Sequence, residues 1–228
     1  MYSAVFFDLD RTLWDFESNA KAAFEAIFVE YNLKAKGIPS SSDFYEKYSL
    51  HNNELWNLYN RGEIIKETLK TARFILTLLD YKINDDMLSI ALGDSYLKYS
   101  LTFNKLFPGA EEIISYLKKS YKLGIITNGF EEIQYHKLKI SGLNKYFDVV
   151  ITSEEAGFKK PNPRIFEYAL SKINAKAEES IMIGDDIEID ILGAKNAGIS
   201  QIYFNPEKNK CPEANFSISD LNEIKTIL

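Results

Sequence analysis

Cysteine is almost absent from this sequence of 228 residues, in which Cys211 is the only one. A single cysteine cannot form a disulfide within the chain, which suits a reducing compartment. The sequence also lacks any uninterrupted apolar run of about 18 residues, the length that a membrane-spanning helix needs. Its first residues show no basic segment and no cleavage site of a secretion signal. We therefore expect a cytoplasmic location and no membrane partner.

Histidine is also scarce, and no segment concentrates positive charge. The formal net charge is −6, and the lysines and arginines are not concentrated in one run. A protein that binds a nucleic-acid polymer normally presents a positive face, so such a partner is not expected. A small nucleotide is not excluded, because a few local cations could hold it. The two histidines, His51 and His136, lack metal-ligand spacing, which argues against a histidine-based metal centre.

Short apolar runs predict the buried strands of a parallel sheet, because each is too short for a buried helix and is rich in β-branched or aromatic residues. These runs are Ala4–Phe7, Leu123–Thr127, Val149–Thr152, Ile181–Ile183 and Ile202–Phe204. Helical patterns separate the last four, one of them running from near Asp186 to Gly198. The alternation predicts an α/β fold with a Rossmann-like, doubly wound parallel sheet. An edge strand at Phe216–Ile218 and a short final helix capped by Asp220 and Glu223 are expected after it.

The segment between the first two strands contains only helical patterns. The candidate helices are Glu17–Tyr31, Ser42–Asn60, Glu63–Leu79 and Asp85–Leu101. A connection of roughly ninety residues is far longer than an ordinary crossover, so we expect an inserted all-helical domain. The expected domains are a core of residues 1–14 and 108–228 and a helical cap of residues 15–107. Linkers near Asp15 and at Asn104–Pro108 could form a hinge.

Polar clusters follow four of the predicted strands. They are Asp8-Leu9-Asp10-Arg11-Thr12, Thr127-Asn128-Gly129, Lys160-Pro161, and Gly184-Asp185-Asp186 with Asp190 beyond. Loops beyond the carboxyl ends of parallel strands form the ligand crevice of an open α/β sheet, so we expect these clusters to meet. Any one of them could be a plain turn or a helix cap. All of them in order, each after its own strand, indicate a single functional site.

The carboxylates suit displacement at phosphorus, which needs a nucleophile, charge neutralisation and a proton carrier. Asp8 ends its strand with a carboxylate that can act as the nucleophile. Asp10 can protonate the leaving oxygen and then take a proton from the hydrolytic water. Carboxylates alone would repel a phosphate, so Asp8 and Asp185 require a cation between them and the substrate. Oxygen ligands favour Mg²⁺ for this purpose.

The remaining polar residues suit phosphate binding. Thr127 offers a hydroxyl, and the backbone N–H groups that follow it, from Asn128 onward, can hold phosphate oxygens at a helix N-terminus. Lys159 and Lys160 are adjacent in the loop after the third strand, and we choose Lys160, which directly precedes Pro161, as the positive charge that can bridge the phosphate and the nucleophile. Asp186 and Asp190 are expected to orient Lys160 or a metal-bound water from a second layer.

In their order and separations these clusters resemble the four motifs of the haloacid dehalogenase superfamily. The helical insertion occupies the place of that family's first-type cap, so the resemblance covers the whole chain. It implies a phosphatase that carries an aspartyl-phosphate on Asp8. It also implies that Mg²⁺ is held by the carboxylates of Asp8 and Asp185 and by the backbone carbonyl of Asp10. The dehalogenases of the superfamily lack an acid/base aspartate where this chain has Asp10, which favours phosphoryl chemistry here.

A finer resemblance concerns the substrate. Three runs, Ile125–Phe130, Ser153–Gly157 with Lys160-Pro161 beyond it, and Ala72–Phe74, are similar to the pyrimidine and noncanonical 5′-nucleotidase branch. The resemblance implies that the substrate is a nucleoside monophosphate. Trp14 and Phe16 could stack on its base, and Arg73 could meet an anion or a carbonyl. The plainer interpretations are packing at the linker for the two aromatic residues and a surface ion pair for Arg73.

Other functions stay open at this point. Sugar-phosphate and acyl-neuraminate phosphatases share much of the core pattern. A phosphomutase would form the same aspartyl-phosphate but return it to a sugar phosphate, and its cap would need a second phosphate site. The cationic residues of the insertion that could form one are Arg61, Lys66, Lys70 and Arg73. A non-catalytic binding module with the same fold is a third class, although no reactive group is missing from the clusters.

Overall fold

The protein is described here by a computed structural model, which covers residues 2–208 and 211–228. The chain divides into two compact units. The core unit consists of Met1–Phe16 and Asn104–Leu228, and the cap unit consists of Glu17–Phe103. Within the described ranges, no helix is long and apolar enough to cross a membrane.

A six-stranded sheet forms the centre of the core unit, and each pair of neighbouring strands is parallel. The strands are β1 (Ala4–Phe7), β2 (Lys122–Thr127), β3 (Val149–Thr152), β4 (Ser180–Gly184), β5 (Ser200–Phe204) and β6 (Phe216–Ile218). Their order across the sheet is β3-β2-β1-β4-β5-β6. The predicted doubly wound parallel sheet is therefore confirmed. Every residue of β1 is buried, as expected of a central strand that is covered on both faces.

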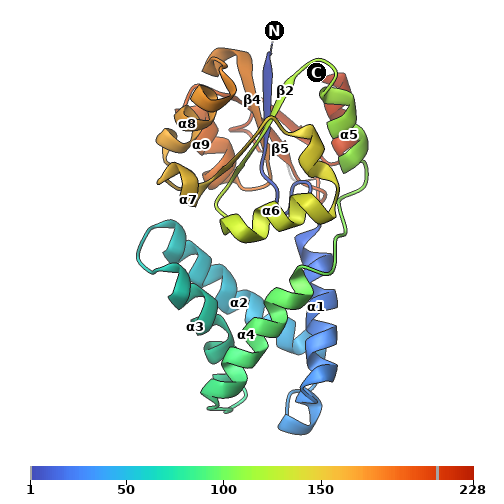
Figure 1. The fold of residues 1–228 in the computed structure, drawn as a ribbon, viewed down its shortest axis with the longest axis vertical. Helices are drawn as coiled ribbons and strands as arrows, with labels where there is room; N and C mark the ends of the chain where they lie inside the picture. The colour runs from blue at the N-terminus through green and yellow to red at the C-terminus, as the bar shows by residue number, and fades with distance from the viewer. Residues whose placement is uncertain (1, 209–210) are drawn as a thin grey trace. The chain divides into compact units, whose positions relative to one another are not determined.

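Helices cover both faces of this sheet (Figure 1). One face packs against α5 (Ala110–Leu117), α6 (Glu131–Ile140) and the final 3₁₀ helix η5 (Leu221–Thr226), and the other against α7 (Ser153–Ala156), α8 (Pro163–Ile173) and α9 (Gly193–Asn196). Successive residues of a strand point to opposite faces. Accordingly, Phe7 belongs to the apolar cluster of α5, and Phe6 belongs to the cluster of α8.

Two helix termini show how the sequence sets the ends of these elements. Asp220 and Glu223 form the predicted capping box at the start of η5. The helix expected from near Asp186 begins as a π-helical segment, η4 (Ile187–Leu192), and continues as α9. The π form is rare and is often found at functional sites. Periodicity along the sequence does not reveal it, because the segment is only six residues long.

The cap unit is helical throughout. Its helices are α1 (Phe16–Glu30), η1 (Leu33–Lys36), α2 (Ser41–Asn60), α3 (Lys66–Leu79) and α4 (Asp86–Ser100). The expected start of α3 at Glu63 is three residues early. Instead, Gly62 takes a left-handed conformation and the N–H of Glu63 donates to the carbonyl of Leu58, which closes the turn after α2.

Aromatic side chains fill the interior of the cap unit. Phe24 is fully buried, and its ring centroid lies 4.6 Å from that of Tyr48 and 5.5 Å from that of Tyr96. The ring centroid of Phe74 lies 5.0 Å from that of Tyr48 and 6.1 Å from that of Phe24. Such ring pairs add to the burial of apolar area. These aromatic residues therefore form the core of the cap unit.

The two linkers run beside each other within the core unit. The N–H of Asp15 donates to the carbonyl of Lys105 (3.1 Å), and the N–H of Phe107 donates to the carbonyl of Leu13 (2.9 Å). An antiparallel bridge joins Trp14 to Leu106 between these two bonds. Both chain segments that lead to the insertion are thus held together by backbone hydrogen bonds.

Candidate active site

The ends of three adjacent strands bring the predicted residues together. Asp8 follows β1, Thr127 is the last residue of β2, and Asp185 follows β4. Because β1 lies between β2 and β4, the three residues lie at the same edge of the sheet. The N–H of Asp8 donates to the carbonyl of Ile183 (2.9 Å) and continues the pairing of β1 with β4. The strand order reverses between β1 and β4, which is where an open α/β sheet forms its ligand crevice.

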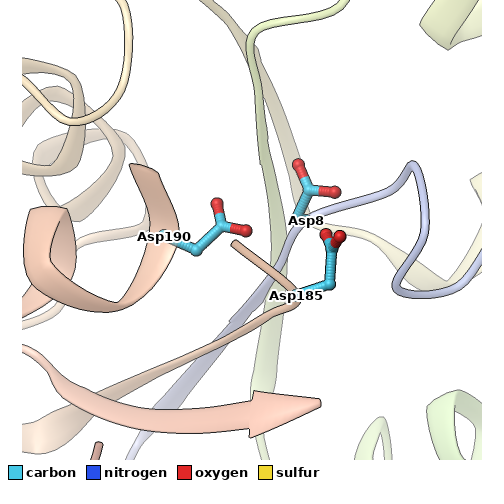
Figure 2. A group of neighbouring side chains, drawn as sticks. All are labelled: Asp8, Asp185 and Asp190. Carbon is cyan, nitrogen blue, oxygen red and sulfur yellow. The ribbon is translucent and has the colours of Figure 1, made fainter. Parts of the chain in front are cut away.

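Three carboxylates converge at this point. Asp8, Asp185 and Asp190 each offer an oxygen, and these oxygens lie within 4.8 Å of one another. Figure 2 shows the three side chains as neighbours, with Asp190 projecting from η4. Gly184 allows Asp190 to approach, because a Cβ atom at Gly184 would lie 2.5 Å from the Cβ of Asp190. This glycine therefore makes the cluster sterically feasible.

Lys160 joins two of these carboxylates. Its Nζ donates to Oδ1 of Asp8 (2.7 Å) and to Oδ1 of Asp190 (2.6 Å), and the residue is only 1% exposed. Burial alone would lower the pKa of Lys160, but the charges of Asp190 and Asp8 outweigh it and raise the pKa. Lys160 is therefore a buried ammonium group beside the predicted nucleophile.

Asp186 and Asp190 were both expected to orient Lys160 or a water, and the structure places them differently. Asp190 contacts Lys160 through Oδ1, and its Oδ2 accepts from the N–H of Asp186 (3.2 Å). The carboxylate of Asp186 accepts from the N–H groups of Glu188 and Ile189 and caps η4. The side chain of Asp186 thus serves the start of this helix.

The electrostatics of the cluster favour a bound cation. Burial raises the pKa of Asp8 to about 7, with Lys160 lowering it and Asp190 raising it further. Burial raises the pKa of Asp185 well above its ordinary value, and the charges of Asp190 and Asp8 add to the effect. Crowded carboxylates of this kind are stabilised by a nearby divalent ion.

The donor atoms fit Mg²⁺. All are oxygens, which this ion prefers. Both oxygens of Asp190 already accept hydrogen bonds. Lys160 contacts Asp8 at Oδ1, and Thr12 donates to Oδ1 of Asp185 (3.4 Å). We therefore favour Asp8 and Asp185 over Asp190 as ligands, and the backbone carbonyl of Asp10 stays a predicted ligand.

Thr127 at the end of β2 and Asn128 in the loop after it are two of the residues that are predicted to bind phosphate. Thr127 is 2% exposed, and its Oγ1 accepts from the N–H of Gly129 (3.0 Å). The helix α6 begins at Glu131, so its N-terminus follows this loop directly. The side chain of Asn128 has a role that we did not expect, because its amide hydrogen-bonds with the backbone of Lys160 (2.8 and 2.9 Å). A phosphate contact of Thr127 and Asn128 stays a prediction.

Asp10 lies between two polar residues of α6 that the sequence analysis missed. Lys137 Nζ contacts Oδ1 of Asp10 (2.5 Å), and Gln134 Nε2 donates to Oδ2 (2.9 Å). Burial alone would raise the pKa of Asp10, but the charge of Lys137 and these hydrogen bonds outweigh it and lower the pKa. The available indication was their spacing: Gln134 and Lys137 stand three residues apart on the helix that follows the Thr127 loop.

Trp14 and Phe16, the two candidates for base stacking, lie near the same lysine. Trp14 is 1% exposed and belongs to the apolar cluster of the core unit. The Nζ of Lys137 lies 5.5 Å from the ring centroid of Trp14 and 5.7 Å from that of Phe16. The guanidinium of Arg11 covers the ring of Phe16 at 4.5 Å. These contacts correspond to packing at the linker, and a contact with substrate stays a prediction.

Arg73, the third specificity candidate, is 5% exposed within the cap unit. It donates to Oδ1 of Asn52 (3.3 Å), and its guanidinium lies 5.2 Å from the ring centroid of Tyr96. Its Nε is buried without a hydrogen-bond partner in the described part of the chain. A surface ion pair, the plainer interpretation of Arg73, is therefore wrong.

Comparisons with known proteins agree with this fold and site. The family model of haloacid dehalogenase-like hydrolases matches residues 2–198. The pyrimidine 5′-nucleotidase YjjG of Escherichia coli is 31% identical, over 98% of this chain and 96% of its own. A glyceraldehyde 3-phosphate phosphatase of Methanothermobacter thermautotrophicus is 35% identical over the full length of both chains.

A solved structure is similar over the same extent. The crystal structure of the hydrolase YfnB of Bacillus subtilis, bound to magnesium, matches with a TM-score of 0.90 and 31% identity, and it covers 100% of this chain and 98% of that one. The family model, the two relatives and the solved structure thus each match this chain over nearly its whole length. The chain belongs to the haloacid dehalogenase-like hydrolase family.

Proposed function

We propose that this protein is an Mg²⁺-dependent phosphatase that forms an aspartyl-phosphate on Asp8 and acts on nucleoside 5′-monophosphates. The observation that carries the proposal is the position of Asp8. Its carboxylate is paired with the ammonium of Lys160 at 2.7 Å, and Asp10 stands two residues further along at the same strand end. A nucleophile, a fixed positive charge and a proton carrier are the groups that phosphoryl transfer requires.

In the first step, an oxygen of Asp8 attacks phosphorus, the bond between phosphorus and the leaving oxygen breaks, and a proton passes from Asp10 to that oxygen. In the second step, water attacks phosphorus and gives a proton to Asp10, which releases phosphate and restores the Asp8 carboxylate. Lys160 stays beside Asp8 throughout and offsets the negative charge of the phosphoryl group. Mg²⁺, held by Asp8 and Asp185, would supply further neutralisation of that charge.

The choice of a nucleotide rests on similarity and on the cap unit. YjjG, named a pyrimidine 5′-nucleotidase, is 31% identical over nearly the whole chain. Arg73 supplies a guanidinium whose neighbours are an amide and aromatic rings, and its Nε has no partner in the described part of the chain. A buried donor of this kind gains free energy from a carbonyl or an anion of a ligand. We keep Arg73 as the candidate for recognising the nucleoside.

A triose or sugar phosphate is the second candidate substrate. The observation that favours it is the archaeal glyceraldehyde 3-phosphate phosphatase, which is 35% identical over both full chains. The residues of the core unit cannot discriminate between a nucleotide and a sugar phosphate, because they act on the phosphoryl group that both substrates carry.

The test is a measurement of phosphate release with Mg²⁺ from uridine, thymidine and adenosine 5′-monophosphates, glyceraldehyde 3-phosphate and p-nitrophenyl phosphate. We expect the highest kcat/KM for a pyrimidine nucleotide. Asp8→Asn should release no phosphate from any compound, whereas Asp43→Asn in the cap unit serves as a matched control that keeps full activity. Phosphate release by Asp8→Asn, or none by the wild-type protein, would refute the phosphatase assignment.

A further inference from the structure

Two side chains of α6 hold both carboxylate oxygens of Asp10. Lys137 contacts Oδ1 and Gln134 contacts Oδ2, at 2.5 and 2.9 Å. We infer that Lys137 and Gln134 are positioning residues for proton transfer: they fix the Asp10 carboxyl group so that Oδ2 exchanges the proton with the leaving group and with water. The inference rests on the proposed phosphatase function.

The environment of Lys137 makes Asp10 its natural partner. Lys137 is 5% exposed, and its Nζ lies near the rings of Trp14 and Phe16. A buried ammonium group that loses its hydrogen-bonded counter-ion carries a large free-energy cost. The aromatic rings exclude water on their side, so the pair with Asp10 is strongly favoured over solvation. Lys137 therefore restrains the direction in which the Asp10 side chain points.

Gln134 reaches Asp10 through a space that Gly129 provides. Gln134 is 1% exposed, and a Cβ atom at Gly129 would lie 2.1 Å from its Nε2. Gly129 also donates its N–H to Thr127, so the loop that we assign to phosphate binding also makes room for this glutamine. The position of the proton carrier is thus coupled sterically to the shape of the phosphate loop.

The two contacts differ in what they allow during catalysis. An ammonium group and an amide N–H can only donate, so neither can accept the proton of a protonated Asp10. The contact with Lys137 joins two oppositely charged groups and is the stronger of the two. The contact with the uncharged amide of Gln134 is therefore the one that opens when Oδ2 carries a proton. The Oε1 atom of Gln134 is buried without a partner among the described residues, so a turned amide could then accept this proton.

These roles assign the proton path. In the first step, the proton on Oδ2 of Asp10 passes to the leaving oxygen as the bond from phosphorus to that oxygen breaks. In the second step, Oδ2 takes a proton from the water that attacks the aspartyl-phosphate. Lys137 keeps its contact with Oδ1 in both steps and stabilises the carboxylate that exists between them.

The test uses leaving groups that differ in their need for a proton. A nucleoside or triose alkoxide needs one, whereas p-nitrophenolate does not. The rate of leaving-group release is measured in single turnovers with enzyme in excess, which isolates the first step. We expect Lys137→Met to slow release from the alkyl phosphate that the wild-type protein hydrolyses by about 100-fold, within the range of general acid catalysis. Release from p-nitrophenyl phosphate should change by less than about 3-fold on the same grounds.

Three variants complete the experiment. Lys137→Arg should restore most of the loss, because it keeps a buried cation in place. Lys139→Met, which removes an exposed charge from the same helix, should behave as wild type. Combining Lys137→Met with Asp10→Asn should slow release no further than Asp10→Asn alone, because both changes act on one proton transfer.

The outcomes separate this inference from the proposed function. If the wild-type protein is active and Lys137→Met slows both substrates equally, or if the double variant loses the product of both single effects, the positioning role is refuted and the phosphatase assignment survives. If the wild-type protein releases product from neither substrate, the phosphatase assignment fails and this inference fails with it.

Discussion

The side-chain amide of Asn128 forms two hydrogen bonds with the backbone of Lys160, donating to its carbonyl oxygen (2.9 Å) and accepting from its N–H (2.8 Å). This pair joins the loop after β2 to the loop that precedes α8. It anchors the backbone of Lys160, whose Nζ contacts Asp8. The lysine that contacts Asp8 is therefore held by the side-chain amide of a residue in a different loop.

Asn128→Ala is expected to lower kcat/KM by about 10- to 100-fold, because it leaves two buried backbone groups of Lys160 unpaired and allows the lysine to move. The measurement is steady-state phosphate release together with thermal unfolding. Asn162→Ala is the matched control: Asn162 caps α8 in the same loop, so this change should cost about 1 kcal/mol of stability without a loss of activity. Equal activity of the two variants would contradict the role of Asn128.

The raised pKa of Asp8 predicts how stability varies with pH when no metal is present. The folded protein binds this proton more tightly than the unfolded chain, because the pKa rises from 3.8 to about 7. Stability from this group is thus complete below about pH 4 and is lost as the pH rises through about 7. Asp8→Asn removes the effect, so the metal-free variant should unfold at a higher temperature than the metal-free wild type at pH 8.

A difference of at least about 3 °C is expected at pH 8, the shift that ~1 kcal/mol gives in a chain of this size. At pH 5 the two proteins should differ little, because Asp8 is then largely protonated. Mg²⁺ should raise the unfolding temperature of the wild type at pH 8 and raise that of Asp8→Asn much less. If the metal-free wild type were more stable than metal-free Asp8→Asn at pH 8, the raised pKa of Asp8 would be contradicted.

Removal of metal with EDTA is expected to stop phosphate release, and added Mg²⁺ should restore it. Asp185→Asn should raise the Mg²⁺ concentration needed for half-maximal activity by at least about 10-fold, because one charged ligand is lost. The measurement is activity against Mg²⁺ concentration. Glu188→Gln removes an exposed carboxylate three residues further on and should leave the curve unchanged. Activity that is insensitive to EDTA would exclude a metal at this site.

Arg73→Met is expected to raise KM for nucleoside monophosphates by about 10-fold or more, the effect of losing one hydrogen bond to a charged donor. KM for p-nitrophenyl phosphate should stay within about 3-fold by the same reasoning, because this compound has no base. Arg61→Met, which removes an exposed arginine of the same unit, is the control. A lower unfolding temperature with unchanged KM values would assign Arg73 to the cap core.

The sheet could be predicted from the sequence because buried parallel strands leave uninterrupted apolar runs. Ala4–Phe7 and Val149–Thr152 are strands with the expected bounds, and so is the short edge strand Phe216–Ile218, of which only Ile218 is buried. The start of α3 was harder to predict, because Glu63-Ile64-Ile65, an acidic residue followed by apolar ones, suits a first helical turn as well as the loop that it forms. Helix propensity alone does not decide between the two.

The principal residues of the site could be predicted because strand ends meet at one edge of a parallel sheet. Gln134 and Lys137 could not, since polar residues at this spacing usually mark a solvated helix face. Only the packing of α6 beside Asp10 shows that they are buried. The side-chain role of Asn128 was missed for a related reason, because its partner is a backbone group 32 residues away.

The paired linkers have a consequence for how such a protein can change. Leu13–Asp15 and Lys105–Phe107 are tied to each other by backbone hydrogen bonds, which do not depend on the side chains beyond them. Residues 17–103 therefore enter and leave the sheet-based unit through one narrow junction. A different helical module could be spliced in at this junction while the Asp8 cluster kept its geometry. Selection can in this way alter residues 17–103 at little risk to the geometry of the Asp8 cluster.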